Sequence, residues 1–504
     1  MKPIQVYYQL KYRGRKAIGY KSKTPNVKFF PKAFQWDNVI KPKILWNGIS
    51  NFTFLNLSRS YDELINWNDA SHGKLWTYNL NYFEFLLQSN ISKEKGLRII
   101  SNYINNYFNL IDGKEPYPTS LRLINWIKFI NQYEIDNDSI VQIIGQDAYR
   151  LLDNLEFHLL ANHLLENGFA LLFAGIYLQD DKVIKKGRQI ISSQLEEQIL
   201  NDGAHYELSA MYHQLMLHRV LDSVQLLRAS SREKSLLELL ESTAAKMLAW
   251  LNAVTFDDGS IPLVNDAAQC VNASTAELAD YAQRLNIDTP TIQLKESGYR
   301  KITKTKYELF LDVGDIKPTY QPGHAHADTF SYLICSDEKP FVVEAGTSTY
   351  ENNIRRKYER STAAHNAVEL KGVSSSKVWS SFRVAQRAKV NIIDESSSKI
   401  SARHNGYNIF VSRDWNYQET FLEINDTLET PALEAISYIH FHPEILIMSS
   451  SSNTLVTNRG EINCSGHSHM EISDYGYSDE FNKEVSAKVL LIYFSQSLIT
   501  KFIF

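Results

Sequence analysis

The chain has 504 residues, a net charge of -4, a hydrophobic fraction of 44% and a charged fraction of 22%. These values are ordinary for a soluble globular protein of about two to four domains, and they exclude a single small module. Aromatic residues make up 12% of the chain. This fits either a large aromatic core or a sugar-binding cleft, because flat rings pack on the apolar faces of pyranoses.

Residues 1–45 are predicted to form a basic N-terminal arm. Nine Lys and Arg residues precede Asp37, with no acid among them. An anionic glycan, an anionic membrane surface or a nucleic acid would attract such a segment, and a flexible solvated arm would also account for it. No nucleic-acid-binding motif follows the arm, so we expect no nucleic-acid partner. A peripheral membrane contact of this arm stays open.

The sequence also bears on the compartment. The basic N-terminus is not followed by the apolar segment of a secretory signal, and no run of 18 apolar residues occurs. The three cysteines, Cys270, Cys335 and Cys464, match neither a disulfide framework nor a zinc knuckle, which suits a reducing compartment. We therefore expect a cytoplasmic protein, which could work at the inner membrane surface.

Residues 46–295 are predicted to be helical. The apolar stretch 151–178 has few breakers and predicts one long helix that is buried on several sides. Short polar loops join the helices, so consecutive helices should pack antiparallel in a bundle, hairpin array or toroid. The other predicted helices lie near 92–108, 119–133, 183–199, 208–228 and 232–254.

Residues 296–504 are predicted to be an antiparallel β-sandwich, and residues 256–300 contain the transition. The segments here are short, rich in β-branched and aromatic residues, and separated by turn formers, without helices between them. A helical domain followed by a sandwich predicts a large groove, where ligands commonly bind. The predicted strands include 307–313, 329–335, 340–344, 367–370, 409–412, 420–428 and 436–442.

Two polar clusters interrupt the helical half. The first is Asn162-His163 with Glu166-Asn167, in the predicted long helix. Buried polar groups each cost about 1–3 kcal/mol unless they are hydrogen-bonded, so four of them within six positions favour a functional role over a single satisfied core histidine. The second cluster is DGAHYELSAMYH at 202–213, in which tyrosine next to histidine suits proton transfer.

Two more clusters lie in the strand-rich half. In PGHAHAD, residues 322–328, His324 and His326 alternate on an extended segment and should point the same way. The other cluster begins at Glu344 and ends at His365-Asn366. His326, Glu344 and His365 could give two imidazoles and a carboxylate to Zn2+, although their long spacing makes this a weak signal alone.

Taken together, these motifs resemble the heparinase II/III family of polysaccharide lyases, which includes related alginate lyases. The matching elements occur in family order, and their combination is specific although no single one is. They are PYPTSLRLINW at 116–126, NHLLENG at 162–168, DGAHYELSAMYH at 202–213, PGHAHAD at 322–328, EAGTSTY at 344–350 and RSTAAHN at 360–366.

The resemblance implies an (α/α) toroid followed by a β-sandwich, and it assigns roles to single residues. Asn162 and His163 would face a uronate, Tyr212 would act as acid or base, and His324 would reach the active site from the sandwich. A mainly structural zinc ion would lie between His326, Glu344 and His365, where relatives commonly have Asp at the position of Glu344.

The implied reaction is β-elimination on an acidic polysaccharide. The uronate carboxylate must be neutralised by an amide or an imidazole before the C5 proton can leave, and a second group protonates the C4 oxygen. Tyr212 could serve if nearby cations such as His213 lowered its pKa. Arg122, Arg355 and Arg360 could hold carboxylates or sulfates, or form structural ion pairs. Further candidates for substrate binding are Glu166, Tyr206, His213 and Tyr350, with Tyr206 also the alternative proton-transfer tyrosine.

Two other functions remain open from the sequence. A glycoside hydrolase on the same scaffold would need a pair of carboxylates, for which Glu166 and Glu207 are the obvious residues. A non-catalytic glycan-binding protein of capsule or O-antigen biosynthesis would suit the missing signal peptide. A lyase could also belong to that metabolism.

Overall fold

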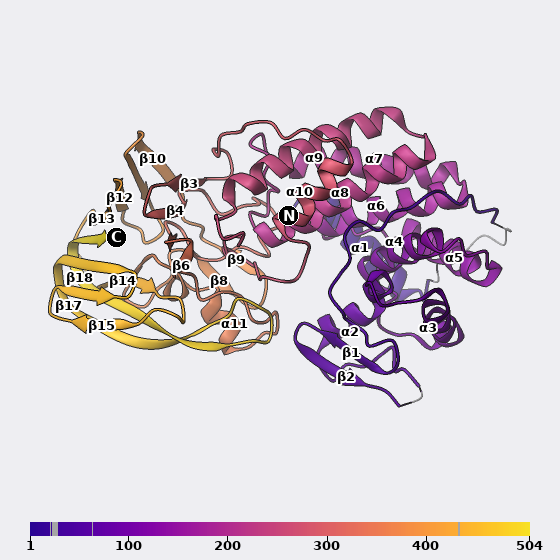
Figure 1. The fold of residues 1–504 in the computed structure, drawn as a ribbon, viewed down its shortest axis with the longest axis horizontal. Helices are drawn as coiled ribbons and strands as arrows, with labels where there is room; N and C mark the ends of the chain where they lie inside the picture. Colours follow the sequence, from indigo (N-terminus) through magenta and orange to yellow (C-terminus); the bar gives the residue numbers. More distant parts are fainter. Residues whose placement is uncertain (21, 23–28, 63, 432–433) are drawn as a thin grey trace. The chain divides into compact units, whose positions relative to one another are not determined.

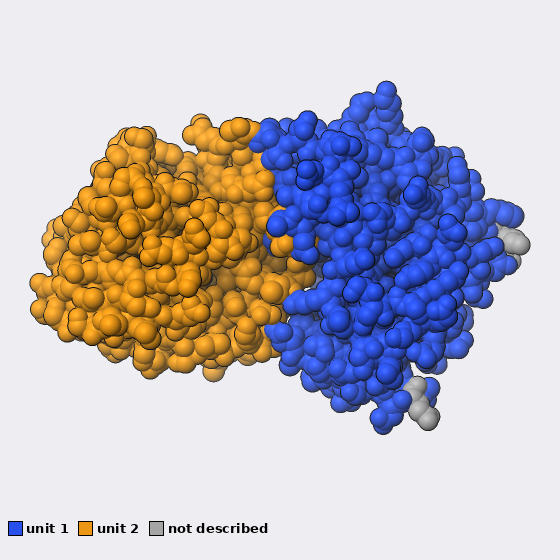
Figure 2. All heavy atoms as spheres, viewed as in Figure 1, with its two compact units in different colours: residues 1–199, 214–248, 276–290 blue, residues 200–213, 249–275, 291–504 orange. Residues whose placement is uncertain are grey.

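The computed structural model describes residues 1–504 except 21, 23–28, 63 and 432–433. The chain forms two compact units that interleave in sequence (Figure 2). Unit 1 comprises residues 1–199, 214–248 and 276–290, and unit 2 comprises residues 200–213, 249–275 and 291–504. The sequence predicted a helical domain over residues 46–295 after an arm of residues 1–45, whereas residues 200–213, which contain the DGAHYELSAMYH motif, and residues 249–275 belong to the unit with the sheets.

Unit 1 is helical, as the periodicity predicted (Figure 1). Helix α4 contacts α2 and α6, whereas α5 contacts α3 and α7, so alternate helices form two layers. Helix α6 is buried along nearly its whole length, whereas α3 and α7 expose one polar face. This layering is that of an (α/α) toroid. The helices are α1 (Pro3–Ala17), α2 (Lys74–Tyr82), α3 (Lys93–Asn106), α4 (Pro116–Gln132), α5 (Asp138–Asp153), α6 (Ala161–Leu178), α7 (Asp181–Gln198), α8 (Ala210–Ser230), α9 (Lys234–Val254) and α10 (Thr275–Arg284), with a hairpin of β1 (Asn51–Phe54) and β2 (Leu57–Ser60).

The prediction of one helix over 151–178 was wrong. Helix α5 ends at Asp153, and α6 begins only at Ala161. Leu160 and Ala161 both have positive φ, 62° and 54°, a conformation that a continuing helix cannot contain. Asn162 and His163 therefore lie in the first turn of α6 and not in a helix interior.

The N-terminal arm contains an ordered helix, α1, which packs on the connection between α5 and α6. The Gln5 side chain donates to the Leu159 carbonyl at 3.2 Å, and the Tyr12 hydroxyl donates to the Leu155 carbonyl at 2.6 Å. Arg15 forms an ion pair with Asp153 at 2.8 Å. Because these contacts fix the helix, residues 3–17 are not a free solvated arm.

Unit 2 is built from antiparallel sheets, which confirms the predicted sandwich class. A ten-stranded sheet has β18 at its centre, paired with β13, β14 and β17, and a four-stranded sheet runs β3-β4-β5-β6. The larger sheet contains β7 (Val368–Leu370), β10 (Val390–Glu395), β11 (Lys399–His404), β12 (Val411–Tyr417), β13 (Phe421–Leu428), β14 (Ala435–His440), β15 (Ile447–Ser450), β16 (Thr454–Thr457), β17 (Gly460–Tyr477) and β18 (Val485–Ile503). The smaller contains β3 (Tyr299–Thr303), β4 (Tyr307–Asp312), β5 (Tyr332–Ser336) and β6 (Lys339–Val342), and β8 (Lys377–Trp379) pairs with β9 (Arg383–Ala385).

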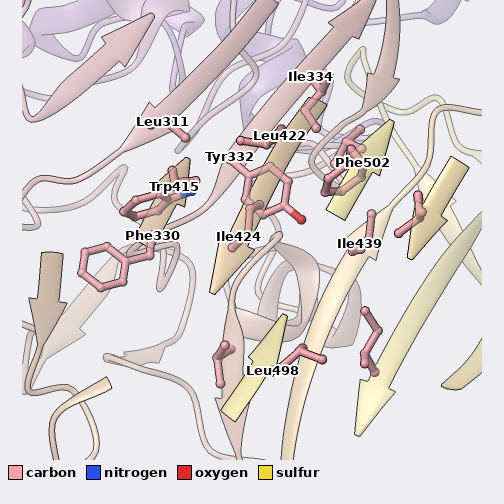
Figure 3. Close-up of a cluster of buried hydrophobic side chains, with 14 of the residues drawn as sticks. Leu311, Phe330, Tyr332, Ile334, Trp415, Leu422, Ile424, Ile439, Leu498 and Phe502 are labelled. Carbon is pink, nitrogen blue, oxygen red and sulfur yellow. The ribbon is translucent and has the colours of Figure 1, made fainter. Parts of the chain in front are cut away.

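The core of unit 2 lies between these two sheets (Figure 3). Leu309 and Ile334 of the smaller sheet, and Trp415, Leu422 and Phe502 of the larger, are all fully buried. Strand β13 alternates half-buried and buried residues, as expected for a strand with one face on a core. The sandwich thus gives rigid support to the loops that leave its strands.

Within the described residues no helix is long and apolar enough to cross a membrane. Cys270, Cys335 and Cys464 are all free thiols.

Candidate active site

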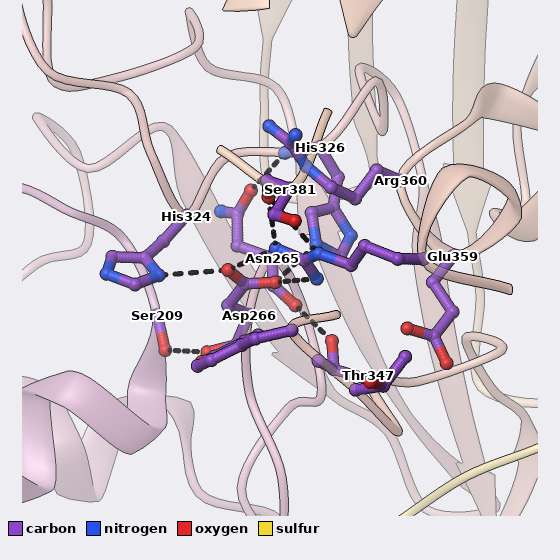
Figure 4. Close-up of polar contacts among 12 residues, drawn as sticks. Ser209, Asn265, Asp266, His324, His326, Thr347, Glu359, Arg360 and Ser381 are labelled. Atoms are coloured by element: carbon purple, nitrogen blue, oxygen red, sulfur yellow. Dashed lines mark hydrogen bonds and ion pairs between the residues drawn. The ribbon is translucent and has the colours of Figure 1, made fainter. Parts of the chain in front are cut away.

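The side chain at the centre of the polar cluster in unit 2 is Asp266 (Figure 4). It is fully buried, and one carboxylate oxygen lies 2.9 Å from Nδ1 of His324 while the other lies 2.9 Å from Nε2 of His326. Arg356 contacts both oxygens through its two terminal nitrogens, with Nη2 at 2.7 Å. The Arg356 guanidinium and the two imidazoles hold the pKa of Asp266 well below its usual range despite burial. Asp266 is therefore an anion that orients both histidines.

His324 and His326 reach the same carboxylate, which confirms that they point the same way. A carboxylate can only accept, so the Nδ1 of His324 carries the proton in this contact and its Nε2 remains available as an acceptor. The His324 side chain is 15% exposed, whereas that of His326 is 2% exposed. Of the two, His324 is the one that a substrate can reach.

Two tyrosines accompany His324. The Tyr212 ring lies 4.1 Å from the His324 ring, and the Tyr212 hydroxyl lies 3.1 Å from the Tyr350 hydroxyl. The Arg356 guanidinium lies 5.0 Å from the Tyr350 ring centre, so the ring is held from one side by a cation. Unit 2 thus brings Tyr212, His324 and Tyr350 into one group, with Asp266 and Arg356 behind them.

The electrostatics of this group differ from the expectation. Burial, followed by the neighbouring Tyr350, raises the pKa of Tyr212 well above its usual value, and burial does the same to the pKa of Tyr350. His213 does not lower the pKa of Tyr212. It is fully buried, its Nδ1 accepts the His205 backbone N–H at 3.1 Å, and its ring lies 4.5 Å from that of Trp250. Tyr212 is therefore a neutral phenol at physiological pH and carries the proton that a general acid must supply.

Backbone strain accompanies these side chains. Leu208, just before the first turn of α8 that contains Tyr212, has φ 55°, and Asn265, next to Asp266, has φ 54°. Non-glycine residues in this region persist only where surrounding contacts impose it, and they cluster at functional sites. Here the Asn265 amide donates to the Leu208 carbonyl and the Tyr299 hydroxyl, both at 3.0 Å. The two strained segments are thus fastened to each other.

The candidate arginines have structural partners. Arg360 is fully buried and donates to the Ala325 carbonyl at 2.8 Å, between the two histidines, and to the Ser380 carbonyl at 3.1 Å. Burial lowers the pKa of Arg360 to about 10. Arg355 pairs with Glu359 at 2.8 Å and Glu484 at 3.3 Å. Arg360 thus supports the backbone of the histidine segment, and its guanidinium is not open to a polysaccharide.

The predicted metal ligands His326, Glu344 and His365 come together in unit 2. His365 Nδ1 contacts the Glu344 carboxylate directly, and the rings of His326 and His365 lie 5.3 Å apart. The free nitrogens, Nδ1 of His326 and Nε2 of His365, are buried without a hydrogen-bond partner among the described residues. Burial lowers the pKa of His326 to about 4 and that of His365 well below its usual value, so both are neutral, as metal ligands must be.

Two imidazoles and a carboxylate are a donor set that suits Zn2+. Among the described residues, however, no group of three or more His, Cys, Asp or Glu side chains has the geometry that holds an ion. The side chains are thus the right kind and adjacent, but they are not arranged around a common centre.

Unit 1 contains the other predicted catalytic residues. His163 Nδ1 lies 3.1 Å from a carboxylate oxygen of Glu156, and the Asn167 amide donates to the other oxygen at 2.9 Å. Asn162 is 2% exposed, whereas the His163 side chain is 38% exposed. Glu156, which the sequence analysis did not single out, therefore orients His163 as Asp266 orients His324.

An aromatic row leads to His163 in unit 1. We define it as Tyr78, Tyr82, Tyr117 and His163, from α2, α4 and α6. Successive ring centres lie 6.4 Å, 6.1 Å and 4.6 Å apart, and all four side chains are half-buried. Half-buried rings in a row suit the apolar faces of successive sugars.

Two other candidates in unit 1 are ion pairs in the helical core. Arg122 is fully buried, and its Nε and Nη2 donate to Asp147 at 3.0 Å and 2.7 Å. Glu166 is fully buried and accepts from Arg219 at 2.8 Å. These contacts favour the structural alternative for Arg122. Burial of Glu166 and of Glu207, 2% exposed, also argues against a hydrolase pair, whose carboxylates must reach the sugar and a water.

Two family models match the chain in order. The model of the heparinase II/III N-terminus matches residues 119–289, and the heparinase II/III-like C-terminal model matches residues 286–501. The chain belongs to the heparinase II/III family.

Solved structures show that this heparinase II/III protein shares its fold with polysaccharide lyases. A structure of heparinase III has 14% identity and a TM-score of 0.72, covering 99% of this chain and 91% of that one. The heparan sulfate lyase HepC of Pedobacter heparinus has 14% identity and a TM-score of 0.61, covering 99% and 87%. The Streptomyces coelicolor A3 chondroitin AC lyase in complex with chondroitin sulphate has 8% identity and a TM-score of 0.51, covering 100% and 80%. No curated protein sequence is significantly similar to this chain.

Three residues that orient the candidate residues escaped the sequence analysis: Glu156 in unit 1, and Asp266 and Arg356 in unit 2. Asp266 and Glu156 lie in irregular segments, where an isolated acid has no periodicity to mark it. Arg356 adjoins Arg355, which was chosen instead. Tyr206, the alternative catalytic tyrosine, is buried, and its hydroxyl lies 2.8 Å from that of Tyr320.

Proposed function

We propose that the protein is a polysaccharide lyase that cleaves a uronic-acid-containing polysaccharide by β-elimination. The observation that carries the proposal is the group of Tyr212, His324 and Tyr350 with the buried Asp266 anion behind His324. It combines a neutral proton donor with an imidazole whose Nε2 is an acceptor, which are the two functions that elimination needs. Family membership and the fold of known lyases support the same reaction.

The residues divide the proton transfers between them in this proposal. His324 Nε2 takes the proton from C5, and the electrons of the C5–H bond form the C4–C5 double bond. The C4–O bond breaks, and Tyr212 gives its hydroxyl proton to the departing oxygen. Tyr350 donates a hydrogen bond to the tyrosinate that forms. A high pKa of Tyr212 suits a group that starts protonated, and bulk water returns both groups to their starting state.

Asn162 and His163 are proposed to neutralise the uronate carboxylate before C5 loses its proton. The support is chemical. Asn162 offers an amide donor, and His163 is half-exposed and held by Glu156. The aromatic row that ends at His163 is proposed to bind neighbouring sugar rings. We further propose that His326, Glu344 and His365 hold a structural Zn2+, which would supply no step of the reaction but would fix the segment containing His324.

A screen of uronate polysaccharides tests the proposal. Purified protein is incubated with heparan sulfate, chondroitin sulfate, alginate and capsular or O-antigen polymers, and the ultraviolet absorbance of a new C4–C5 double bond is recorded. The Tyr212→Phe protein serves as the matched control. We expect absorbance with at least one polymer and none with the variant. Reducing ends without absorbance would indicate a hydrolase, and binding without either product would indicate a glycan-binding protein; each contradicts the proposal.

A further inference from the structure

Helix α1 has a packed face that is unusually polar. Gln5, Tyr8, Tyr12 and Arg15 recur every three or four residues and therefore lie along one side of the helix. Tyr8 stacks on Phe157 at 4.7 Å, and Gln5, Tyr12 and Arg15 bind the α5–α6 connection as described above. The helix is thus attached to unit 1 through tyrosine rings and hydrogen bonds, and not through its aliphatic side chains.

Most of the exposed apolar side chains of α1 and of its C-cap residue Ile18 lie on the opposite side, whereas Ile4 falls next to Arg15. Val6, Tyr7 and Leu10 are 45%, 61% and 62% exposed, and Ile4 and Ile18 are 40% and 78% exposed. At 100° per residue, Val6, Tyr7, Leu10 and Ile18 fall on one arc. An ordinary surface helix buries its apolar arc and exposes its polar one. In α1 the arrangement is reversed, so its outward face is an apolar surface without a partner among the described residues of unit 1.

Basic residues border this outward face. Lys11 follows the arc on one side; it is half-buried, with its Nζ 4.9 Å from the centre of the Tyr8 ring. The exposed Arg13 follows the arc on the other side, and the exposed Lys16 lies beyond Arg13, toward the packed side. Within the described residues no ion pair involves these three, unlike Lys2 and Arg15, which pair with Glu197 and Asp153. No acidic residue precedes Asp37 in the sequence. The surface is therefore apolar at its centre and cationic at its edges, and the nearby carboxylates of Glu197 and Asp153 are paired with Lys2 and Arg15.

We propose that the outward face of α1 docks the protein on an anionic phospholipid surface. Stable binding to a membrane surface requires two contributions. Aliphatic side chains are buried at the boundary of the acyl chains, and Lys and Arg side chains are attracted to the anionic headgroups. The helix has 15 residues and is fixed to unit 1 along one side, so it lies in the plane of the surface and does not cross it.

Other occupants fit this face less well. A second copy of the chain in a two-fold contact would bring the same cations against each other without an acid to offset them. A soluble acidic polysaccharide would use the cations but leave Val6, Leu10 and Ile18 in water. A surface with both an anionic and an apolar layer would contact both the cations and the apolar side chains of this face. The proposal is independent of the lyase activity.

Vesicle flotation tests the proposal with the full-length protein. The probes are vesicles of phosphatidylcholine with about a third phosphatidylglycerol, and vesicles of phosphatidylcholine alone. We expect binding to the first, and weaker binding to the second. Replacing Lys11, Arg13 and Lys16 by Gln should weaken binding to the anionic vesicles on the order of 100-fold, at about fivefold per charge. Raising the salt concentration should weaken it as well.

The decisive variant is Val6→Glu with Leu10→Glu, which should weaken binding roughly tenfold or more because two apolar anchors become acids. Its matched control is Ile49→Glu with Ile111→Glu, two exposed isoleucines elsewhere in unit 1, 76% and 79% exposed, which should bind as the parent does. Thermal unfolding should be alike for both, since neither pair packs in the core. Equal binding by both variants, or no binding of the parent protein, would overturn the proposal. A dimer of the parent protein that dissociates in Val6→Glu with Leu10→Glu and not in the control would also overturn it. The same holds if the parent protein binds soluble heparin but no vesicles, and the variant still binds heparin.

Discussion

His324 is held by the buried carboxylate of Asp266, whose oxygen lies 2.9 Å from its Nδ1 across 58 positions of sequence. The same carboxylate binds Arg356 and His326, so one side chain fixes the tautomer of the proposed base and the position of the segment that contains it. The site in unit 2 is thus organised around an anion that the substrate never needs to touch.

Asp266→Asn should reduce lyase activity by about 100-fold or more, because the orientation of His324 is lost. It should also destabilise the protein by about 3–5 kcal/mol, because Arg356 becomes an uncompensated buried charge. Urea unfolding and initial rates by absorbance measure the two effects. Adding Arg356→Met to Asp266→Asn should restore part of the stability but none of the activity. If activity returned together with stability, Asp266 would have only a structural role.

Tyr212→Phe should abolish turnover with a loss of stability of less than about 1 kcal/mol, since its hydroxyl bonds only to Tyr350 among the contacts observed. The rate should fall by about 100-fold to 10,000-fold. Tyr417→Phe is a control for the loss of a tyrosine hydroxyl, because that hydroxyl binds the Ser396 carbonyl in the turn between β10 and β11, away from the candidate site. If Tyr206→Phe is inactive and Tyr212→Phe active, Tyr206 and not Tyr212 is the proton donor.

His326→Ala should lower both the zinc content and the melting temperature of unit 2. A ligand contributes folding free energy when the site forms only in the folded chain, so a chelator should destabilise the parent protein and not the variant. Metal content is measured by mass spectrometry, and melting by calorimetry with and without chelator. His442→Ala, at a half-buried histidine outside the ligand set, is the control. Unchanged metal content in His326→Ala would remove this residue from the ligand set.

Arg122→Met should destabilise unit 1 by about 3–5 kcal/mol, because Asp147 loses its main partner, and should leave KM for the polysaccharide unchanged. Arg122 and Arg150 hold the pKa of Asp147 below its usual value in the fold. The resulting stabilisation is fully present above pH ~4, the pKa of Asp147 in the unfolded chain. It is lost as the pH falls toward the lower pKa that Asp147 has in the folded protein.

Unfolding free energies between pH 3 and pH 7 should therefore fall less steeply on acidification in Arg122→Met than in the parent. A rise in KM without a loss of stability would instead assign Arg122 to substrate binding.

The order of a helical half and a strand-rich half was predictable because both periodicities are local. Buried strands such as β4 and β13 were predicted within a residue or two, since alternation and β-branched composition are properties of a few neighbouring residues. The break before Asn162 was not predictable, because positive φ at Leu160 and Ala161 is imposed by contacts of the folded chain and not by those residue types.

By itself the sequence determined the family and the residue types for proton transfer and metal binding, because both follow from motifs of fixed spacing. The tertiary structure alone decided which charged side chains are bound by other groups of the protein and are therefore closed to a substrate. Arg122, Arg360 and Glu166 have the same chemistry as substrate-binding groups, but they are buried on partners far along the chain. Asp266 became central for the same reason: a lone acid in a loop acquires its role only when folding removes water and brings two imidazoles and a guanidinium to it.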